Sequence, residues 1–569
     1  MKHILFCIIA LMSGLFASAQ NTSSHLIKQG TATQLVVGGK PMLILGGELG
    51  NSSASSTADI EKIFPKLRRM GLNTAFVPAY WDLIEPQEGQ FDFTLINKVV
   101  EQARKDSLKV VFLWFGAWKN SMSCYAPQWF KTNYKKYPRA HTKDGKPLEI
   151  ASAFSENVFN ADSKAFTQLL KHIAQLDPTA ETVPIIQIEN EIGMLENARD
   201  YSTVANKSYT ADVPTSLLKY LQKNKSQLHP KMLKKWQDNG CKMKGNWQTV
   251  FGDDIYTEEI FTAYYYALYV ERLAKIARAT FNVPLYVNAA LNSRNRKPGE
   301  YPAGGPLAHL IDIWHCAAPS IDFIAPDLYD KDFTGWVGQY KLHNNPFFTP
   351  EVRLADNDGV RAFYVFGELD GISFSPFSIE NAPDSPSSPL TQAYNKLRQL
   401  TPIILKHQGK GEMSGLLFDS ENKERIINRD GYKMTCRHYF TLPWDPRAKN
   451  EPWQEGGGII IHLDKNEYII AGSGIVISFE KDGEAKTKAV QNLGEDGFVN
   501  SGGNNNIQNS SYNGQPIIGI ASVDEVEVNP DASLRYIRRL NGDEDHQGRH
   551  VRIGVDNFQI LHVKLYEYK

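Results

Sequence analysis

The chain has 569 residues, which is enough for two or more domains with sizeable cores. Hydrophobic residues make up 42% of it and charged residues 22%, an ordinary globular balance. Its 62 basic and 63 acidic residues leave a net charge of -1, which argues against a nucleic-acid partner or an anionic membrane surface.

The first 19 residues are typical of a secretory signal peptide. A positively charged start precedes the apolar stretch Ile4–Leu15, and Ala17, Ser18 and Ala19 form an A-x-A cleavage site. The apolar stretch is too short to span a membrane, and no later segment approaches a span. We therefore expect a soluble, exported protein that is periplasmic or secreted after cleavage near Ala19.

Residues 35–407 alternate between short apolar runs and amphipathic helical patterns. This alternation indicates a parallel sheet covered by helices, and eight candidate strands are the number that closes a (β/α)₈ TIM barrel. A polar, lysine-rich insertion interrupts the pattern at about residues 197–252. The candidate strands are residues 41–47, 72–77, 110–115, 183–188, 283–288, 321–326, 346–350 and 362–367.

Residues 408–569 have a different pattern, in which short strands are separated by Gly- and Asn-rich turns. The pattern predicts an all-β sandwich domain, with a long loop at Ser501–Tyr512. The cysteines beyond the predicted cleavage site form no C-x-x-C pair, so we expect no zinc site, and no other metal or cofactor. The sequence does not indicate an oligomeric state.

Two strand ends carry acidic residues. The fourth candidate strand ends in Glu189, Asn190 and Glu191, and the seventh is followed by Glu351. Burying an unpaired charge is costly, so these carboxylates are expected to emerge into a cleft. In a TIM barrel the C-terminal strand ends face the active site. Glu189 and Glu191 would share a face in a regular strand, so alternation alone does not distinguish them.

Paired carboxylates across a barrel mouth suit glycoside hydrolysis. One carboxyl group protonates the leaving oxygen, and the other attacks the anomeric carbon. In enzymes that retain the anomeric configuration the two groups lie roughly 5–5.5 Å apart. Neighbouring negative charge and partial burial would raise the pKa of the acid.

Residues 186–193, Ile-Gln-Ile-Glu-Asn-Glu-Ile-Gly, resemble the Gln-x-Glu-Asn-Glu-aromatic-Gly signature of glycoside hydrolase family 35, the β-galactosidases. Residues 81–86 and 89–93 resemble that family's Trp-Asn-Leu-His-Glu-Pro and Gly-x-Phe-Asp-Phe run, and residues 127–129 its Pro-x-Trp. The resemblance covers roughly residues 35–407. It implies a retaining (β/α)₈ hydrolase with a carbohydrate substrate and no cofactor.

The resemblance also implies roles for particular residues. Glu191 matches the acid/base and Glu351 the nucleophile. Asn190 matches the amide that holds the sugar 2-hydroxyl, and Tyr329 matches a tyrosine that supports the nucleophile. Glu368, after the eighth candidate strand, is the rival of Glu351 and otherwise a substrate-binding candidate. Further candidates for substrate binding are Asn288 and three tryptophans that either stack on sugars or fill the core: Trp81, Trp118 and Trp336.

The sequence also departs from the family pattern. Ile192 replaces the usual aromatic, and Ala117-Trp118-Lys119 stands where the family has Ala-Glu-Trp, so a glutamate that reads a galactose hydroxyl is missing. We therefore predict an exported, retaining exo-β-galactosidase that removes terminal galactosyl residues from plant-type oligo- or polysaccharides. The alternatives are a β-glycosidase for another sugar, such as an arabinopyranoside, or a glycan-binding protein without catalysis.

Overall fold

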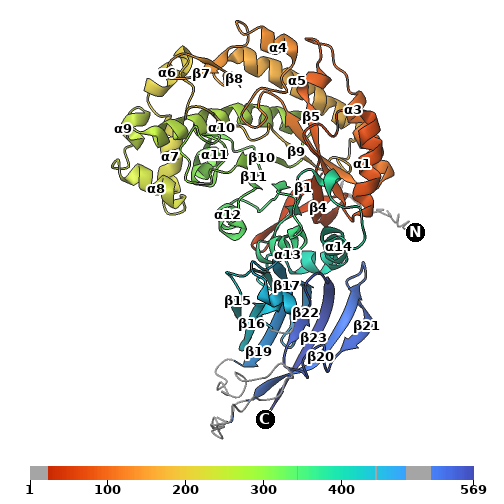
Figure 1. Cartoon of the computed structure of the whole chain (residues 1–569). Coiled ribbons are helices and arrows are strands. Elements are labelled where there is room, and N and C mark those ends of the chain that lie inside the picture. Colours follow the sequence, from red (N-terminus) through yellow and green to blue (C-terminus); the bar gives the residue numbers. More distant parts are fainter. Residues whose placement is uncertain (1–23, 343, 443–444, 482–513, 515) are drawn as a thin grey trace, which may run out of the picture.

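The structure, a computed structural model, describes residues 24–342, 344–442, 445–481, 514 and 516–569. The predicted signal peptide and the predicted Ser501–Tyr512 loop lie outside these residues. No described helix is both long enough and apolar enough to cross a membrane. A barrel with its helices forms one end of the molecule and antiparallel sheets form the other (Figure 1).

Eight parallel strands make up the barrel sheet, in the order β12-β11-β10-β9-β6-β5-β4-β13. Its two edges meet where Val352 pairs with Pro376 and the Val352 amide donates to the Ser375 carbonyl at 3.0 Å. The predicted TIM barrel is confirmed. The strands are β4 (Ile44–Glu48), β5 (Thr74–Tyr80), β6 (Lys109–Phe115), β9 (Ile185–Gln187), β10 (Leu285–Ala290), β11 (Phe323–Leu328), β12 (Glu351–Val352) and β13 (Ser373–Phe374).

Helices surround the barrel because each has one apolar face. In α1 (Thr57–Arg69) the buried residues are Ile60, Phe64 and Leu67, and the Ser56 hydroxyl caps the first turn by accepting from the Asp59 amide at 3.1 Å. The other barrel helices are α2 (Trp81–Ile84), α3 (Thr94–Lys105), α4 (Gln128–Thr132), α5 (Glu156–Leu176), α10 (Ile255–Thr280), α11 (Ile311–Ala317) and α12 (Phe333–Tyr340). Additional strands are β1 (His25–Gln29), β2 (Ala32–Val37), β3 (Lys40–Met42), β7 (Arg139–His141) and β8 (Pro147–Ala151).

The prediction of an eighth strand at residues 362–367 is wrong. These residues lie in helix α13 (Asp358–Glu368), and the eighth strand is β13. Helix α13 packs against α14 (Pro389–His407) and against strands of the C-terminal sheets, so it is apolar on nearly all sides. A short apolar run buried in this way does not distinguish a helix from a strand.

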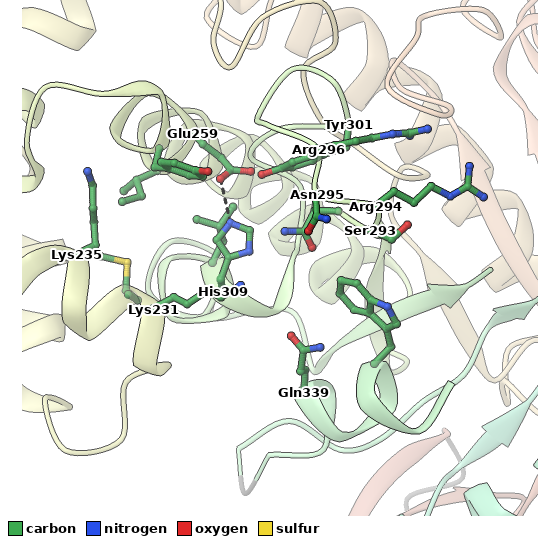
Figure 2. A pocket seen from close by; sticks show the side chains of 16 residues that line it. Lys231, Lys235, Glu259, Ser293, Arg294, Asn295, Arg296, Tyr301, His309 and Gln339 are labelled. Atoms are coloured by element: carbon green, nitrogen blue, oxygen red, sulfur yellow. Dashed lines mark hydrogen bonds and ion pairs between the residues drawn. The ribbon is translucent and has the colours of Figure 1, made fainter. Parts of the chain in front are cut away.

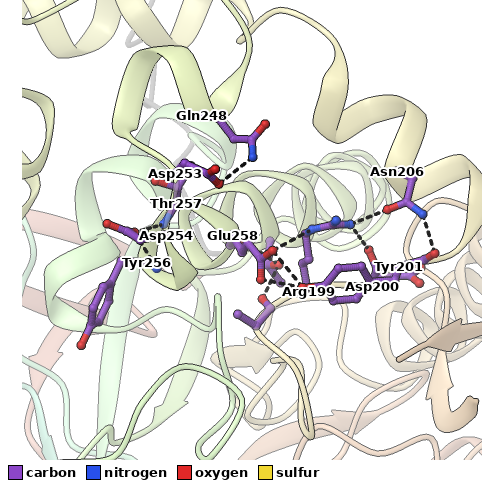
Figure 3. A network of polar contacts seen from close by, with 12 residues as sticks. Arg199, Asp200, Tyr201, Asn206, Gln248, Asp253, Asp254, Tyr256, Thr257 and Glu258 are labelled. Carbon is purple, nitrogen blue, oxygen red and sulfur yellow. Dashed lines mark hydrogen bonds and ion pairs between the residues drawn. The ribbon is translucent and has the colours of Figure 1, made fainter. Parts of the chain in front are cut away.

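The lysine-rich insertion contains four short helices beside the barrel (Figure 1). A polar network joins it to α10 (Figure 3): Arg199 lies 3.5 Å from Glu258, and the Tyr201 hydroxyl donates to that carboxylate at 2.8 Å. Arg199 also donates to Asn206 at 2.7 Å. These contacts fix the insertion against the barrel. Its helices are α6 (Thr203–Thr210), α7 (Thr215–Lys223), α8 (Pro230–Gln237) and α9 (Trp247–Phe251).

Two antiparallel sheets form the C-terminal region, in the orders β14-β17-β18-β23-β20-β21 and β15-β16-β19-β22. They share one apolar core, which contains Leu416 and Ile470 from the first sheet and Met434 and Ile477 from the second. The strands are β14 (Met413–Phe418), β15 (Glu424–Arg429), β16 (Tyr432–His438), β17 (Gly456–Asp464), β18 (Glu467–Ser473), β19 (Ile475–Lys481), β20 (Ile517–Val528), β21 (Leu534–Leu540), β22 (Val551–Ile553) and β23 (Gln559–Tyr568).

Glu368 joins the barrel to these sheets. It ends α13, and its carboxylate accepts from both terminal nitrogens of Arg425 on β15, at 2.8 and 3.0 Å. The Gly415 amide on β14 donates to the same carboxylate at 3.0 Å. The candidate role of Glu368 at the active site is therefore a wrong prediction, because its carboxylate is bound at the junction between the two regions.

Removing this contact should destabilise the protein. We expect Arg425→Ala to lower the free energy of unfolding by about 1–2 kcal/mol, because it leaves the half-buried Glu368 carboxylate without its cation. Urea unfolding measures the change. Arg535→Ala, which removes an exposed pair with Glu527, is the control, with an expected loss of about 0.5 kcal/mol or less. Equal losses in the two variants would contradict the role of this junction.

Candidate active site

Carboxyl groups converge at the C-terminal end of the barrel. Glu48 ends β4, Asp327 lies in β11 directly beside Glu351 of β12, and Glu191 follows β9. All four side chains are buried, with Glu191 6% and Glu351 5% exposed. Parallel strands of one barrel deliver their C-terminal residues to a common mouth, so these acids share a small space.

The backbone after β9 sends its two glutamates to different places. Glu189 and Glu191 have φ angles of 57° and 46°, in the left-handed region that residues other than glycine seldom adopt. Glu189 lies in the barrel wall, where its Oε2 accepts from the Trp118 amide at 2.8 Å. Glu191 belongs to the carboxyl cluster. A regular strand would have put both on one face, and the strained turn separates them.

Glu191 is held from two sides. Its own amide donates to Asn288 Oδ1 at 2.9 Å, and Asn288 Nδ2 donates to Asp327 at 2.7 Å. The side-chain amide of Asn120 donates from Nδ2 to Glu191 Oε2. Asn288, predicted as a substrate-binding residue, thus acts within the protein as a link between Glu191 and the neighbouring acid.

Glu351 accepts a hydrogen bond from the Tyr329 hydroxyl at Oε1. Burial is the main cause that raises the pKa of Glu351, to about 7, and the charge of Glu191 adds to it. Lys119, Tyr329 and the Glu48 carboxyl act in the opposite direction. The structure therefore brings Tyr329 to Glu351, and it brings the charges of Glu191 and Glu351 within interacting range.

Their surroundings shift Glu48 and Asp327 toward their protonated forms. Burial and then the charge of Glu351 raise the pKa of each well above its usual range. These shifts favour the neutral form of both acids, which lowers the repulsion in the cluster. Sequence reasoning did not select Glu48, Asp327 or Lys119 as site residues. Glu48 and Asp327 have a common signal, since each is an acidic residue at the C-terminal end of a barrel strand.

Asn190 is fully buried, and its side-chain oxygen and nitrogen make no hydrogen bond with any described residue. Buried amides are nearly always satisfied, and an exception beside a catalytic-type carboxylate needs a reason. A polar ligand such as a sugar hydroxyl would supply the missing partner. The geometry is compatible with the predicted role of Asn190.

The prediction that Trp81 and Trp118 stack on sugars is wrong. Trp81 is fully buried, donates to Glu85 at 3.0 Å and packs on Trp114. Trp118 is also fully buried and packs edge-on against Tyr269, with ring centroids 4.8 Å apart. Both rings belong to the barrel wall. Trp336 is partly exposed and lines a cavity formed by α8, α10, the loop after β10 and α12.

The fold and site together define a (β/α)₈ barrel with a cluster of buried carboxyl groups at its mouth. Comparison with known proteins agrees with this class. The family model described as Beta-galactosidase, glycoside hydrolase family 42, matches residues 52–258. The matched region contains Glu191 and ends before Glu351. A family model described as a domain of unknown function (DUF5597) matches residues 390–552.

A β-galactosidase of Xanthomonas manihotis is 28% identical over 203 residues, which are 34% of this chain and 31% of that protein. The matched region thus spans about a third of that relative. Among solved structures, β-galactosidases from Marinomonas ef1 and Bacillus circulans sp. alkalophilus are 12% and 13% identical, with TM-scores of 0.43 and 0.44. They align with 64% and 65% of this chain and with 60% and 58% of their own.

The chain thus resembles β-galactosidases among the glycoside hydrolases. The signature around Glu191 resembles family 35, whereas the matching family model is that of family 42. The predicted family number is therefore not established.

The raised pKa of Glu351 predicts a pH-dependent change in stability. The folded state binds the Glu351 proton more tightly than the unfolded chain, so this residue costs stability as pH rises from about 4.5 to about 7. The free energy of unfolding of Glu351→Gln, measured with urea, should therefore exceed that of the wild type by roughly 3 kcal/mol at pH 8. At pH 4.5 the two proteins should differ little. The exposed Glu424→Gln is the control. Equal stability of Glu351→Gln and the wild type at both pH values would contradict the raised pKa of Glu351.

Proposed function

We propose that the protein is an exported, retaining β-galactosidase that removes terminal β-galactosyl residues from plant-type oligo- or polysaccharides. The observation that carries this proposal is geometric: Glu191 follows β9 and Glu351 begins β12, so two buried carboxyl groups from separate strands meet at the barrel mouth, where their charges interact. Two carboxyl groups that face one barrel mouth are the apparatus that double displacement at an anomeric carbon requires.

In the first step the Glu351 carboxylate attacks the anomeric carbon, and the bond from that carbon to the glycosidic oxygen breaks. Glu191 donates its proton to the departing oxygen. The product is a galactosyl ester of Glu351 and a free alcohol. The Tyr329 hydroxyl, bound to Glu351 Oε1, keeps the other carboxylate oxygen available for attack. Asn190 offers its unpaired amide to a sugar hydroxyl.

In the second step Glu191, now ionised, takes a proton from water while the water oxygen attacks the anomeric carbon. The ester bond breaks, and the Glu351 carboxylate is released. The ester carries no charge, so the repulsion between Glu351 and Glu191 is absent while Glu191 acts as the base. Two inversions at the same carbon leave the galactose in its original β configuration.

The sugar specificity has one competing assignment. Lys119 lies in the part of the strand-three loop where the resembling family has the Ala-Glu-Trp sequence, and its charge acts on Glu48 and Glu351. Trp118 stands at the position of the hydroxyl-reading glutamate and Lys119 follows it, so this loop lacks that carboxylate and suits a different set of sugar hydroxyls. The second candidate is therefore a retaining β-glycosidase for another sugar, such as an arabinopyranoside. Rates on a panel of aryl β-glycosides distinguish the two.

Export of the protein rests on the signal-like residues 1–19. Expression of the full chain with fractionation of the cell tests it. The proposal expects the activity outside the cytoplasm and a mature N-terminus near Gln20.

Chemical rescue separates the two carboxylates. Replacing Glu191 with Ala should lower kcat for an aryl β-galactoside with a poor leaving group by about 10²–10⁴-fold, because proton donation is lost. A dinitrophenyl leaving group needs no proton, so its first step should stay fast, and added azide should yield a β-galactosyl azide. Glu351→Ala should be inactive on both substrates, with azide giving the α-galactosyl azide.

The control is Glu85→Gln, whose parent carboxylate is buried and accepts from Trp81 Nε1 and from the Gly89 backbone amide. It should keep the activity of the wild type, provided that it folds. Turnover at the wild-type rate by either the Glu191 or the Glu351 variant would remove that residue from the reaction. Absence of turnover on every aryl β-glycoside by the wild type would instead favour a glycan-binding protein.

A further inference from the structure

A cavity of about 560 Å³ lies beside the barrel mouth and is formed in part by the insertion (Figure 2). Its walls come from α8 of the insertion, α10, the loop that follows β10, and α12. None of these walls carries the proposed catalytic residues. The cavity has the size of a small-ligand site, which for a carbohydrate is room for one or two sugar units.

The cavity shares its supporting strands with the candidate active site. Its loop begins shortly after Asn288, which binds the Glu191 amide, and α12 begins shortly after Tyr329, which binds Glu351. The segment beyond Glu191 also pairs with this wall, since Met194 forms a β-bridge with Ala303. The cavity and the carboxyl cluster are thus built on the same two strand ends, β10 and β11.

Basic side chains dominate the charge of this cavity. Lys231, Arg294 and Arg296 line it and form no ion pair with any residue that the structure describes, whereas Lys235 is paired with Asp254 at 2.5 Å. In a chain with a net charge of -1, such a group of unpaired cations is a local excess that attracts anions.

The acidic residue of the cavity does not neutralise these cations. Glu259 is fully buried at the cavity wall, and its Oε2 lies 2.9 Å from His309 Nε2. Its carboxyl group is therefore already bound to that ring. In Figure 2 Arg294 and Arg296 extend away from the Glu259–His309 pair. The guanidinium groups are therefore separate from the buried acid and are available to another anion.

The loop that presents the arginines has a strained backbone. Arg294 and Asn295 have φ angles of 67° and 53°, two consecutive residues in the left-handed region without a glycine. Such conformations persist where the surroundings enforce them, and they concentrate at ligand sites. The partly exposed Trp336 and the amide of Gln339 add an aromatic face and hydrogen-bonding groups to the same cavity.

We propose that this cavity is a subsite for an acidic sugar, which Arg294 and Arg296 recognise by its anionic group while Trp336 contacts its ring. The proposal rests on the exo-acting galactosidase proposed above, because the only sugars beyond the galactosyl unit are then those of the leaving group. The substrate class is a β-galactoside whose leaving group carries a uronic acid. Arginine suits this role, since its planar guanidinium binds a carboxylate through two parallel hydrogen bonds.

Defined substrates test the proposal. These are 3-O- and 4-O-β-galactosyl disaccharides whose second sugar is glucose, glucuronic acid or glucose 6-sulfate, together with an aryl β-galactoside. The wild type should show a kcat/KM for at least one glucuronic acid disaccharide about 10-fold or more above that for its glucose counterpart. The double variant Arg294→Gln/Arg296→Gln should lose this preference and keep its rate on the aryl substrate. Arg535→Gln, on the distant strand β21, is the control and should behave as wild type.

Each outcome has a separate meaning. A preference for glucose 6-sulfate over glucuronic acid, lost in the same double variant, would retain the anionic subsite and overturn the uronic acid as its ligand. Equal rates on neutral and acidic disaccharides, or a preference that survives the double substitution, would overturn the subsite while hydrolysis of the aryl galactoside still supports the proposed function. No hydrolysis of the aryl substrate would overturn the proposed function itself. In that case calorimetric titration of wild type and double variant with the same disaccharides decides the subsite, and equal binding by the two proteins would reject it.

Discussion

Repulsion among buried carboxyl groups is the constraint that shapes the mouth of this barrel. Four of them, Glu48, Glu191, Asp327 and Glu351, share the barrel mouth, where a low effective dielectric makes like charges costly. The protein limits the cost by raising the pKa of Glu48 and of Asp327, which favours their neutral forms, and by placing the charge of Lys119 nearby. What remains is one pair of groups whose ionisation is coupled. Burying such a pair lowers the stability of the folded protein. The large apolar core of the barrel and its helices offsets this loss.

The same constraint accounts for the local structure around the pair. Glu191 can reach the cluster only because the backbone after β9 adopts left-handed angles, while Glu189 turns into the wall against Trp118. The Tyr329 hydroxyl donates a hydrogen bond to the Glu351 carboxylate, and Asn288 Oδ1 accepts one from the backbone amide of Glu191. Identical side chains thus acquire different proposed roles through their surroundings, as acid/base catalysis requires. Beside this acidic centre the insertion and the loop after β10 line a cavity with basic side chains, so charge of the opposite sign gathers there.

Much of the fold was predictable because the barrel strands are continuous apolar runs between amphipathic helices. Residues 362–367 were mispredicted because α13 is covered by the barrel, α14 and the C-terminal sheets, which removes the polar face that identifies a helix. The two acids Glu191 and Glu351 were selected from their strand ends. The contribution of Lys119 and the raised pKa of Glu48 were not, since both depend on distances across the barrel that sequence spacing does not contain. Trp81 and Trp118 failed as sugar platforms for a similar reason: a tryptophan near a strand end can face the mouth or the wall, and packing decides which.

Trapping of the glycosyl-enzyme intermediate tests the central claim most directly. A 2-deoxy-2-fluoro-β-galactosyl fluoride slows hydrolysis of the ester, because fluorine destabilises the positively charged transition state. Mass spectrometry of the treated protein and of its peptides should show one fluorodeoxygalactosyl unit on Glu351, and none in Glu351→Gln. A label on Glu191, on Glu48 or on a residue outside the mouth, in a protein that turns over aryl β-galactosides, would contradict Glu351 as the nucleophile and with it the paired-carboxylate mechanism.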